Sequence, residues 1–386
     1  MKPIDLSTIR KQNLHKILDL LTGAPAQTRQ DLARRTGLSL MTVSNMIDLL
    51  KERDLLCFTP VLRESGHGAR ASSGRKAEAI TLCGDRHAWL LVDISGRQFR
   101  MSLLGFDLQT LLDVRDTGSG SYLQRLEAFL AQNRERLKAA LQSRSLLGAA
   151  VVTPGPYEIT SDTVRNQRLP ELNGVLIKAF FQRHLGDYDY YVDEDVKFAV
   201  RAFSTLIEQN RCELLYYLYI GEGVGGAAVH NGNMLRGLNA TAGDAGQLTD
   251  PSGRTYESLL SLSAFAALLG VPAQTSAEML MHTLDRLAEQ EPERYKAALR
   301  AAAARVASML HSVLWMLDPS DIIIDCPYAA PYEDCFTACI LENLKDNLAA
   351  SHRATPAVSP APRGMSSVLR GAVQVLQREW IERALS

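Results

Sequence analysis

The sequence of 386 residues has no uninterrupted apolar run of about 18 residues, the length that a membrane-spanning helix needs. Its first residues, MKPIDLSTIRKQNLHK, carry charges throughout and include no apolar core of signal-peptide length. These absences argue against a membrane span and against secretion. We therefore predict a cytoplasmic protein with no membrane partner.

Cysteine is scarce and scattered, and no Cys-x-x-Cys pair suggests a zinc site or a redox motif. A chain of this length can build two or three hydrophobic cores without disulfide support. We therefore expect six reduced thiols, at Cys57, Cys83, Cys212, Cys326, Cys335 and Cys339.

A strong net charge is also absent, because 42 basic and 43 acidic residues nearly cancel. The charges are unevenly distributed. Residues 1–82 contain 13 Lys and Arg against 8 Asp and Glu, a net charge of +5, whereas the remainder contains 29 against 35, a net charge of −6. A basic module on an acidic body predicts a polyanionic partner for the first part only.

Three helices are predicted in the basic module. Apolar residues recur at three- and four-residue steps over residues 6–21, as on one face of a helix. Residues 28–37 begin with an N-cap, Thr28, have Asp31 at the capping-box position and end at a glycine. Ser39 can cap the third helix, whose inward face is expected to comprise Val43, Met46, Ile47 and Leu50.

The segment DLARRTGLS, which comprises most of the second helix and the turn to the third, is typical of a helix-turn-helix that places its third helix in the major groove. A three-helix packing or protein-docking unit is the alternative, but the turn sequence and the basic charge favour DNA binding. The predicted DNA contacts of these helices are Thr28, Arg29, Ser39, Met41, Thr42, Ser44 and Asn45.

Residues 57–82 predict two short strands joined by a basic loop rich in Gly and Ser, which together would form a wing. The alternative is a solvated linker. With these strands as its wing, the segment 1–82 would form a winged helix-turn-helix domain. The basic loop could then neutralise phosphates or enter the minor groove. Its predicted DNA contacts are Arg63, Arg70, Arg75 and Lys76.

The remainder alternates predicted strands and helices, which indicates an α/β fold. Residues 88–106 read as two buried strands joined at Ser95-Gly96, with Asp93 at the end of the first. Further strands are expected at 147–154, 188–192, 214–220 and 322–325, and helices at about 258–269, 276–290 and 293–317.

Several segments of this body match the motifs of one family: Asp93–Gly96 and Ile220–Gly226 (phosphate motifs), Thr153–Pro156 (a Pro-Gly turn), Asp193–Asp195 (an Asn-Asp pair), and the glycine-rich stretches 231–237 and 242–247 followed by 256–261. With its N-terminal module, the chain resembles the repressor branch of the ROK family of repressors, open reading frames and kinases. The resemblance implies a two-lobed actin-like (ribonuclease H-like) sugar-kinase fold. One lobe would comprise 83–199 and 366–386, and the other 200–365, with oligomerisation helices.

The departures from the family argue against kinase activity. Ser95–Arg97 stands where active members have Gly-Gly-Thr, and Asp325–Cys326 replaces a later Gly-Gly. Glu222 replaces a threonine of the second phosphate motif, and its carboxylate would repel a triphosphate. We therefore expect no enzymatic activity and no cofactor.

The zinc site of the family is also missing from the sequence. Gln247 stands in place of the histidine ligand, and the segment LTDPSGRTY has no cysteine to supply a thiolate. We therefore expect no metal ion.

The polar residues that remain in the motifs could hydrogen-bond a polyol, since sugars are recognised by several polar groups fixed in a cleft. The residue aligned with Asp195 is the general base of the family's kinases. An inert hinge cleft with inherited polar residues is the alternative. The predicted ligand-binding residues are Asn166, Asp195, Asp244, Gln247 and Glu257.

We therefore predict a transcriptional repressor of carbohydrate-related genes that binds double-stranded operator DNA as a homodimer or a dimer of dimers. Its effector would be a sugar or a sugar derivative. One alternative is a functional ATP-dependent sugar kinase with an added DNA-binding domain, which the retention of Asp93 and Asp195 favours. Another is a repressor controlled by a partner protein.

Overall fold

The structure, a computed structural model, describes residues 6–22, 26–60, 78–96, 98–116, 118, 120–166, 169–203, 213–272, 276–349, 354–363 and 366–385. These residues form two compact units. Unit 1 comprises residues 1–154, 161–193 and 373–386, and unit 2 comprises residues 155–160 and 194–372. The predicted DNA contacts Arg63, Arg70, Arg75 and Lys76 lie outside the described residues.

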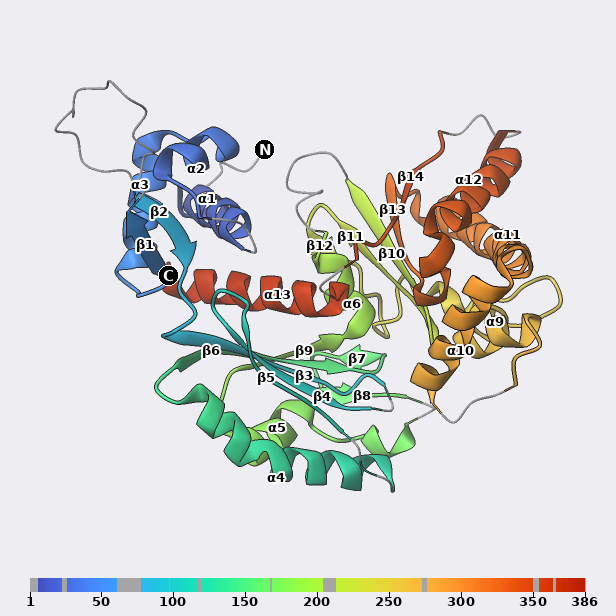
Figure 1. Ribbon diagram of the computed structural model, residues 1–386, viewed down its shortest axis with the longest axis horizontal. Helices are drawn as coiled ribbons and strands as arrows, with labels where there is room; N and C mark the ends of the chain where they lie inside the picture. Colours follow the sequence, from blue (N-terminus) through green and yellow to red (C-terminus); the bar gives the residue numbers. More distant parts are fainter. Residues whose placement is uncertain are drawn as a thin grey trace. The chain divides into compact units, whose positions relative to one another are not determined.

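The N-terminal module of unit 1 has the predicted order of three helices and two strands (Figure 1): α1 (Leu6–Leu21), α2 (Arg29–Thr36), α3 (Leu40–Lys51), β1 (Leu56–Pro60) and β2 (Glu78–Leu82). Thr28 and Asp31 form the predicted capping box, and Gly37 ends α2 with a φ of 71°, a left-handed conformation that suits glycine. β1 and β2 pair antiparallel, with Phe58 opposite Ile80. The predicted strands on either side of the wing loop are therefore confirmed.

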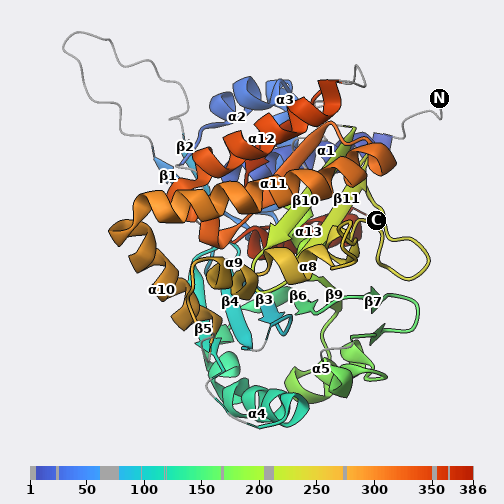
Figure 2. The ribbon, with the colours of Figure 1, turned by 90° about the vertical axis from the view of Figure 1, so that its right-hand side faces the viewer.

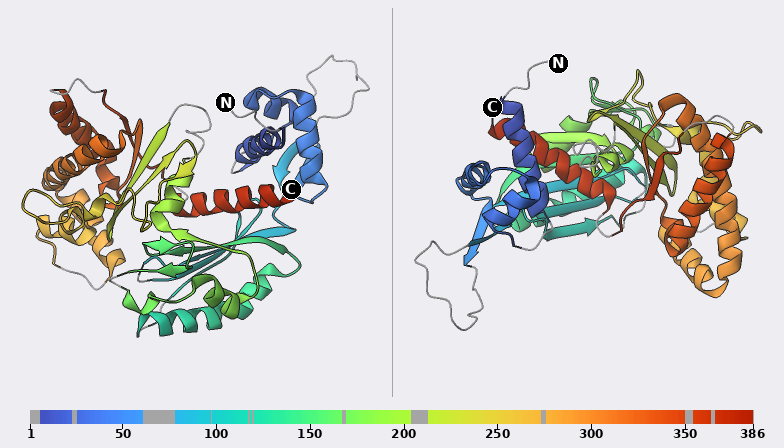
Figure 3. Two further views of the ribbon diagram at one scale, coloured as in Figure 1. Left: turned by 180° about the vertical axis from the view of Figure 1, so that it is seen from behind. Right: turned by 90° about the horizontal axis from the view of Figure 1, so that it is seen from above.

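The sheet of unit 1 has the strand order β5-β4-β3-β6-β9. Its strands are β3 (His87–Asp93), β4 (Arg100–Gly105), β5 (Thr110–Arg115), β6 (Ser145–Thr153) and β9 (Tyr190–Glu194). β3 pairs antiparallel with β4 and parallel with β6. Figures 1 and 3 show α4 (Tyr122–Leu141) and α5 (Ile177–Leu185) on one face of this sheet, and the C-terminal part of α13 (Ser367–Ala384) on the other. Short elements are β8 (Thr163–Val164) and η1 (Pro170–Leu172).

The sheet of unit 2 repeats this topology, with the order β12-β11-β10-β13-β14. β10 pairs antiparallel with β11 and parallel with β13. The strands of this sheet are β10 (Leu214–Ile220), β11 (Val224–His230), β12 (Asn233–Met234), β13 (Asp321–Asp325) and β14 (Ala357–Pro360). The short strand β7 (Tyr157–Glu158) is not part of it. In each sheet the first strand lies at the centre, between an antiparallel hairpin and a parallel neighbour.

Alternate residues of β10 face two separate cores. Tyr216, Leu218 and Ile220 pack with the helices after β11, whereas Leu215 and Tyr217 pack with α6 (Asp195–Arg201). On the first face α11 and α12 lie side by side (Figure 2). The remaining elements are η2 (Ala245–Gln247), α8 (Tyr256–Leu260), α9 (Leu262–Leu268), α10 (Ala277–Gln290), α11 (Pro292–Leu317), η3 (Pro327–Tyr332) and α12 (Glu333–Ala349).

Two helices lie at the borders between the units. α6 belongs to unit 2, where it packs on β10 and β11. α13 begins in unit 2 and ends in unit 1. The domain boundaries expected from the sequence, after residues 82, 199 and 365, stay predictions. No helix in the described part of the chain has the length and apolarity required to cross a membrane.

Candidate nucleic-acid interface and ligand site

Helix α3 has one buried face and one exposed face, as the sequence predicted. Val43, Met46, Ile47 and Leu50 are buried, whereas Met41 is 76% exposed. Ser39 caps the helix by accepting a hydrogen bond from the Thr42 amide at 3.1 Å.

The outer surface of the N-terminal half of α3 is chemically mixed. It combines one flexible thioether with short hydroxyl and amide side chains, all fully or partly exposed: Ser39, Met41, Thr42, Ser44 and Asn45. An amide can pair with adenine, hydroxyls can pair with several bases, and apolar groups can contact the thymine methyl. This surface therefore has the composition of a base-reading surface.

Arg29 connects three elements of the DNA-binding module. Its guanidinium donates to Asp48 Oδ1 at 3.2 Å, lies 3.7 Å from Glu78 Oε2, and sits 5.8 Å from the centroid of the Phe58 ring. The hydroxyl of Thr28 donates to Asp31 Oδ2 at 2.7 Å within the capping box. Both predicted DNA contacts therefore have internal partners, and they fix α2 and α3 relative to the strands of the wing.

Asp93 and Asn166, two residues of unit 1 that the sequence analysis singled out, each accept hydrogen bonds from residues that follow closely in the chain. Asp93 Oδ1 accepts hydrogen bonds from the amide and the hydroxyl of Ser95, at 2.9 and 2.7 Å, and burial raises the pKa of Asp93. Asn166 Oδ1 accepts from the Leu169 amide at 3.0 Å. Asn166 belongs to unit 1 and the other four predicted ligand-binding residues belong to unit 2, so the grouping of all five in one site stays a prediction.

Those four residues, Asp195, Asp244, Gln247 and Glu257, lie on segments that meet at the beginning of β11. Glu257 Oε2 accepts from the Val224 amide at 3.4 Å. A Cβ on Gly225 would lie 3.1 Å from the side chain of Val196, which follows Asp195.

The segment with Asp244 and Gln247 touches the same strand. Tyr216 donates to the Gly243 carbonyl at 2.8 Å, and a Cβ on Gly246 would overlap the Val224 carbonyl. The three segments that carry these four polar residues thus meet at one strand end.

Carboxylates dominate the surroundings of this strand end. Burial, followed by the negative charges of Asp195, Asp325 and Glu222, raises the pKa of Tyr219 well above its usual value. Tyr217 donates to Asp325 Oδ2 at 2.6 Å. Several carboxylates therefore lie close to this strand end.

Sequence reasoning missed a buried ion pair at the beginning of α6. Lys197 is 1% exposed and donates both to Glu194 and to the Ala240 carbonyl, the latter at 2.6 Å. Glu194 in turn accepts from the Tyr157 amide at 2.8 Å. The only signal in the sequence was a lysine between the apolar residues Val196 and Phe198, and it could not identify these partners.

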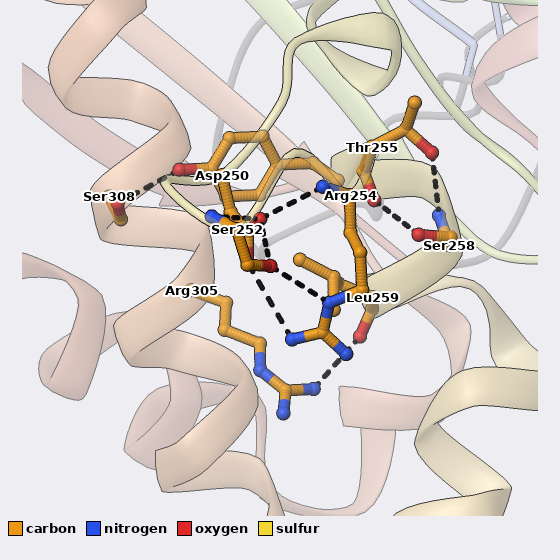
Figure 4. A network of polar contacts seen from close by, with 9 residues as sticks. Asp250, Ser252, Arg254, Thr255, Ser258, Leu259, Arg305 and Ser308 are labelled. Carbon is orange, nitrogen blue, oxygen red and sulfur yellow. Dashed lines mark hydrogen bonds and ion pairs between the residues drawn. The ribbon is translucent and has the colours of Figure 1, made fainter.

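The loop before α8 contains none of the residues that the family's zinc site requires. Figure 4 shows instead that Asp250 organises it, because Asp250 Oδ1 accepts from Ser252 N, Ser252 Oγ and Arg254 N at 2.9, 2.6 and 3.0 Å. Thr255 then caps α8, the helix that carries Glu257. The residues of this loop do not fit a zinc ion. Among the described residues, no group of three or more His, Cys, Asp or Glu side chains could hold a metal ion.

Comparisons with known proteins find similarity in both parts of the chain. The profile of the ROK family matches residues 90–379, and that of a winged helix-turn-helix DNA-binding domain matches residues 10–56. A search of curated proteins finds no significant match. A DNA-binding domain joined to a ROK domain is the organisation of a transcriptional regulator.

Solved structures with the same fold include both regulators and kinases. A ROK family transcriptional regulator, described as a homologue of the E. coli MLC protein, is 15% identical with a TM-score of 0.64, covering 98% of this chain and 99% of that chain. A Streptococcus pneumoniae ROK family protein in complex with sucrose is 17% identical, with a TM-score of 0.60 and coverages of 76% and 98%. A Streptomyces griseus ROK family glucokinase in complex with glucose and AMPPNP is 16% identical, with a TM-score of 0.61 and coverages of 75% and 99%.

Proposed function

Because the chain belongs to the ROK family and begins with a winged helix-turn-helix, we propose that it is a sugar-responsive transcriptional repressor without kinase activity. The observation that carries this proposal is the division of α3 into a buried apolar face and an exposed surface that includes Met41 and Asn45. A helix that only filled a core would not expose that surface. Homodimerisation would present two such helices to the half-sites of a pseudo-palindromic operator.

The first experiment is a gel shift with genomic DNA fragments over a series of salt concentrations. We expect saturable binding that weakens as salt rises, because the contacts to phosphate release counterions. Asn45→Ala should reduce the preference for the selected fragment over random DNA by about tenfold. This is the effect expected when one base contact worth roughly 1–3 kcal/mol of discrimination is lost. Lys138→Ala, on the exposed surface of α4, is the matched control and should bind normally. Equal affinity of the wild-type protein for all fragments would refute the proposal.

The sugar ligand is supported by the meeting of three segments, which carry four polar residues, at the beginning of β11. Proteins of the same fold have been crystallised with sucrose and with glucose. The effector would contact Asp195, Asp244, Gln247 and Glu257, and Asn166 stays a predicted fifth contact. A thermal-shift screen with sugars, sugar phosphates and polyols should give at least one stabilising compound, since a ligand that binds only the folded state raises its stability. Glu257→Gln should reduce that shift.

The absence of kinase activity is proposed from the carboxylates near Tyr219, which oppose the binding of nucleotide phosphates. A coupled assay of ADP release with common hexoses should detect no turnover above that of Asp195→Asn. Turnover that this substitution abolishes would favour a functional sugar kinase with an added DNA-binding domain.

If a partner protein controls the repressor instead of a sugar, the same experiments should give a different result. No sugar would then change DNA binding, whereas a protein from the cell lysate would bind the repressor and change its affinity for the operator. That outcome would refute the sugar effector and leave the DNA-binding function intact.

A further inference from the structure

Helix α13 makes contacts along its whole length, and they begin beside the candidate ligand site. Ser367, in its first turn, donates to Asp325 at 3.4 Å. A Cβ on Gly371 would overlap the carbonyl oxygen of Phe198, so the backbones of α13 and α6 touch directly. Asp195, a candidate ligand contact, is the first residue of α6. A displacement of α6 would therefore push on the first turns of α13.

The middle of α13 is packed on the sheet of unit 1. A Cβ on Gly148 of β6 would lie 3.1 Å from the Leu376 side chain, and the ring of Trp380 lies 6.3 Å from that of Phe106. Arg383, near the end of the helix, donates to Asp189 at 2.7 Å. Because α13 is one continuous helix, these contacts join its two ends mechanically.

The last two turns of α13 hold the DNA-binding module. Glu382 forms an ion pair with Lys11 of α1, and the carbonyl of Ala384 accepts from Arg53 at 3.0 Å. Arg53 also donates to the Leu49 carbonyl at 3.3 Å, within the final turn of α3. His15 of α1 is half-buried and lies close enough to Arg378 and Glu382 to feel their charges. The end of α13 therefore contacts both α1 and the end of the base-reading helix.

We propose that α13 transmits the state of the ligand site to the DNA-binding module, and that docking of the module on Lys11, Glu382 and Arg53 is the DNA-binding state. This inference rests on the proposed function. A docked module has a fixed orientation, so two modules of a dimer can engage two half-sites together. An undocked module keeps its base-reading surface but loses the fixed geometry that joint binding needs.

The substitution Glu382→Lys distinguishes a role of docking from an effect of added positive charge on DNA affinity. It places a new ammonium group beside Lys11 and Arg378 and should separate α1 from α13. Because it adds positive charge, it should strengthen DNA binding if charge alone mattered. The proposal predicts the opposite, a two- to tenfold weaker binding to a two-half-site operator selected with the wild-type protein. Binding to a single half-site should not weaken.

Two further variants separate docking from misfolding. Lys11→Glu combined with Glu382→Lys restores an ion pair with reversed charges and should recover most of the operator affinity. The exchange of Glu135 and Lys138, an exposed pair on α4, is the matched control. Hydrogen exchange of the amides of α1 should be faster in Glu382→Lys and slower again in the double variant.

The outcomes distinguish this inference from the proposed function. If the wild-type protein selects no operator, the proposed function fails. If it selects one and Glu382→Lys binds that operator as tightly or more tightly, the role of α13 is refuted. A charge-reversed double variant that stays as weak as Glu382→Lys would also overturn the proposal.

Discussion

The ammonium group of Lys197 donates to the carbonyl oxygen of Ala240 at 2.6 Å, across 43 positions of the sequence. The same group forms an ion pair with Glu194, which also holds the Tyr157 amide. One buried lysine therefore joins α6 to the segment that leads to Asp244, and it fixes two of the candidate ligand contacts relative to each other.

Lys197→Met should destabilise unit 2 by about 3–5 kcal/mol, because it leaves the Glu194 carboxylate buried without its ammonium partner. The double variant Lys197→Met with Glu194→Gln removes both charges and should recover part of the loss. Urea unfolding followed by far-UV circular dichroism measures the difference. Lys138→Met, which breaks an exposed pair, is the control and should change stability by less than about 1 kcal/mol.

Gly246→Ala should damage the ligand site, because its Cβ would overlap the carbonyl oxygen of Val224. Backbone atoms cannot move aside as a flexible side chain can, so we expect a loss of about 1–3 kcal/mol and a reduced thermal shift with the effector. Gly96→Ala is the control, because a Cβ there has no neighbour closer than 4.0 Å. A fully stable Gly246→Ala protein would contradict the described packing of η2 on β11.

His15 should make the protein less stable as the pH falls. Burial, with the positive charge of Arg378, lowers the pKa of His15 from 6.5 to about 4, although Glu382 acts in the opposite direction. Above pH 6.5 the imidazole is neutral in both the folded and the unfolded chain. Between pH 6.5 and 4 only the unfolded chain binds the proton, so stability falls by up to about 3 kcal/mol.

The pH dependence of His15→Gln measures this contribution. The free energy of unfolding is compared between pH 7 and pH 4.5 for the wild type and the variant. The wild type should lose more stability than His15→Gln over that range. Parallel curves for the two proteins would show that His15 is not held neutral between α1 and α13.

Asp250→Ala should open the loop before α8, because three hydrogen bonds to Asp250 Oδ1 are lost. Trypsin should then cleave after Arg254 several-fold faster than in the wild type, since cleavage follows the population of the open loop. Treatment with EDTA should leave the wild-type cleavage rate unchanged. Asp85→Ala, at a highly exposed carboxylate on the surface of unit 1, is the control.

Local elements were predictable from the sequence because their causes lie within a few residues. The capping box of Thr28 and Asp31 and the N-cap at Ser39 depend on hydrogen bonds across three positions, and both were predicted correctly. The buried face of α3 follows from the helical period. Several strands were similarly visible as short apolar runs. The predicted strand 214–220 has the bounds of β10, whereas 188–192 is shifted by two residues relative to β9.

The contacts that organise the candidate sites could not be predicted in this way. Asn166 and Asp195 belong to different units, and their grouping in one ligand site stays a prediction. The partners of Lys197 and of Glu382 are distant in sequence, and no periodicity relates them. Arg29 stays a predicted DNA contact, and its ion pairs with Asp48 and Glu78 form only when α2, α3 and β2 are folded together.

The sequence by itself determined the helices of the N-terminal module, two of their N-caps and the exposed surface of α3, because hydrogen bonds and burial along one element repeat at short intervals. Only the tertiary structure decided that α13 spans both units and meets α1, and that Lys197 holds the Ala240 segment. Such contacts form between surfaces that the folded chain brings together, and their energy depends on burial and distance rather than on spacing along the chain.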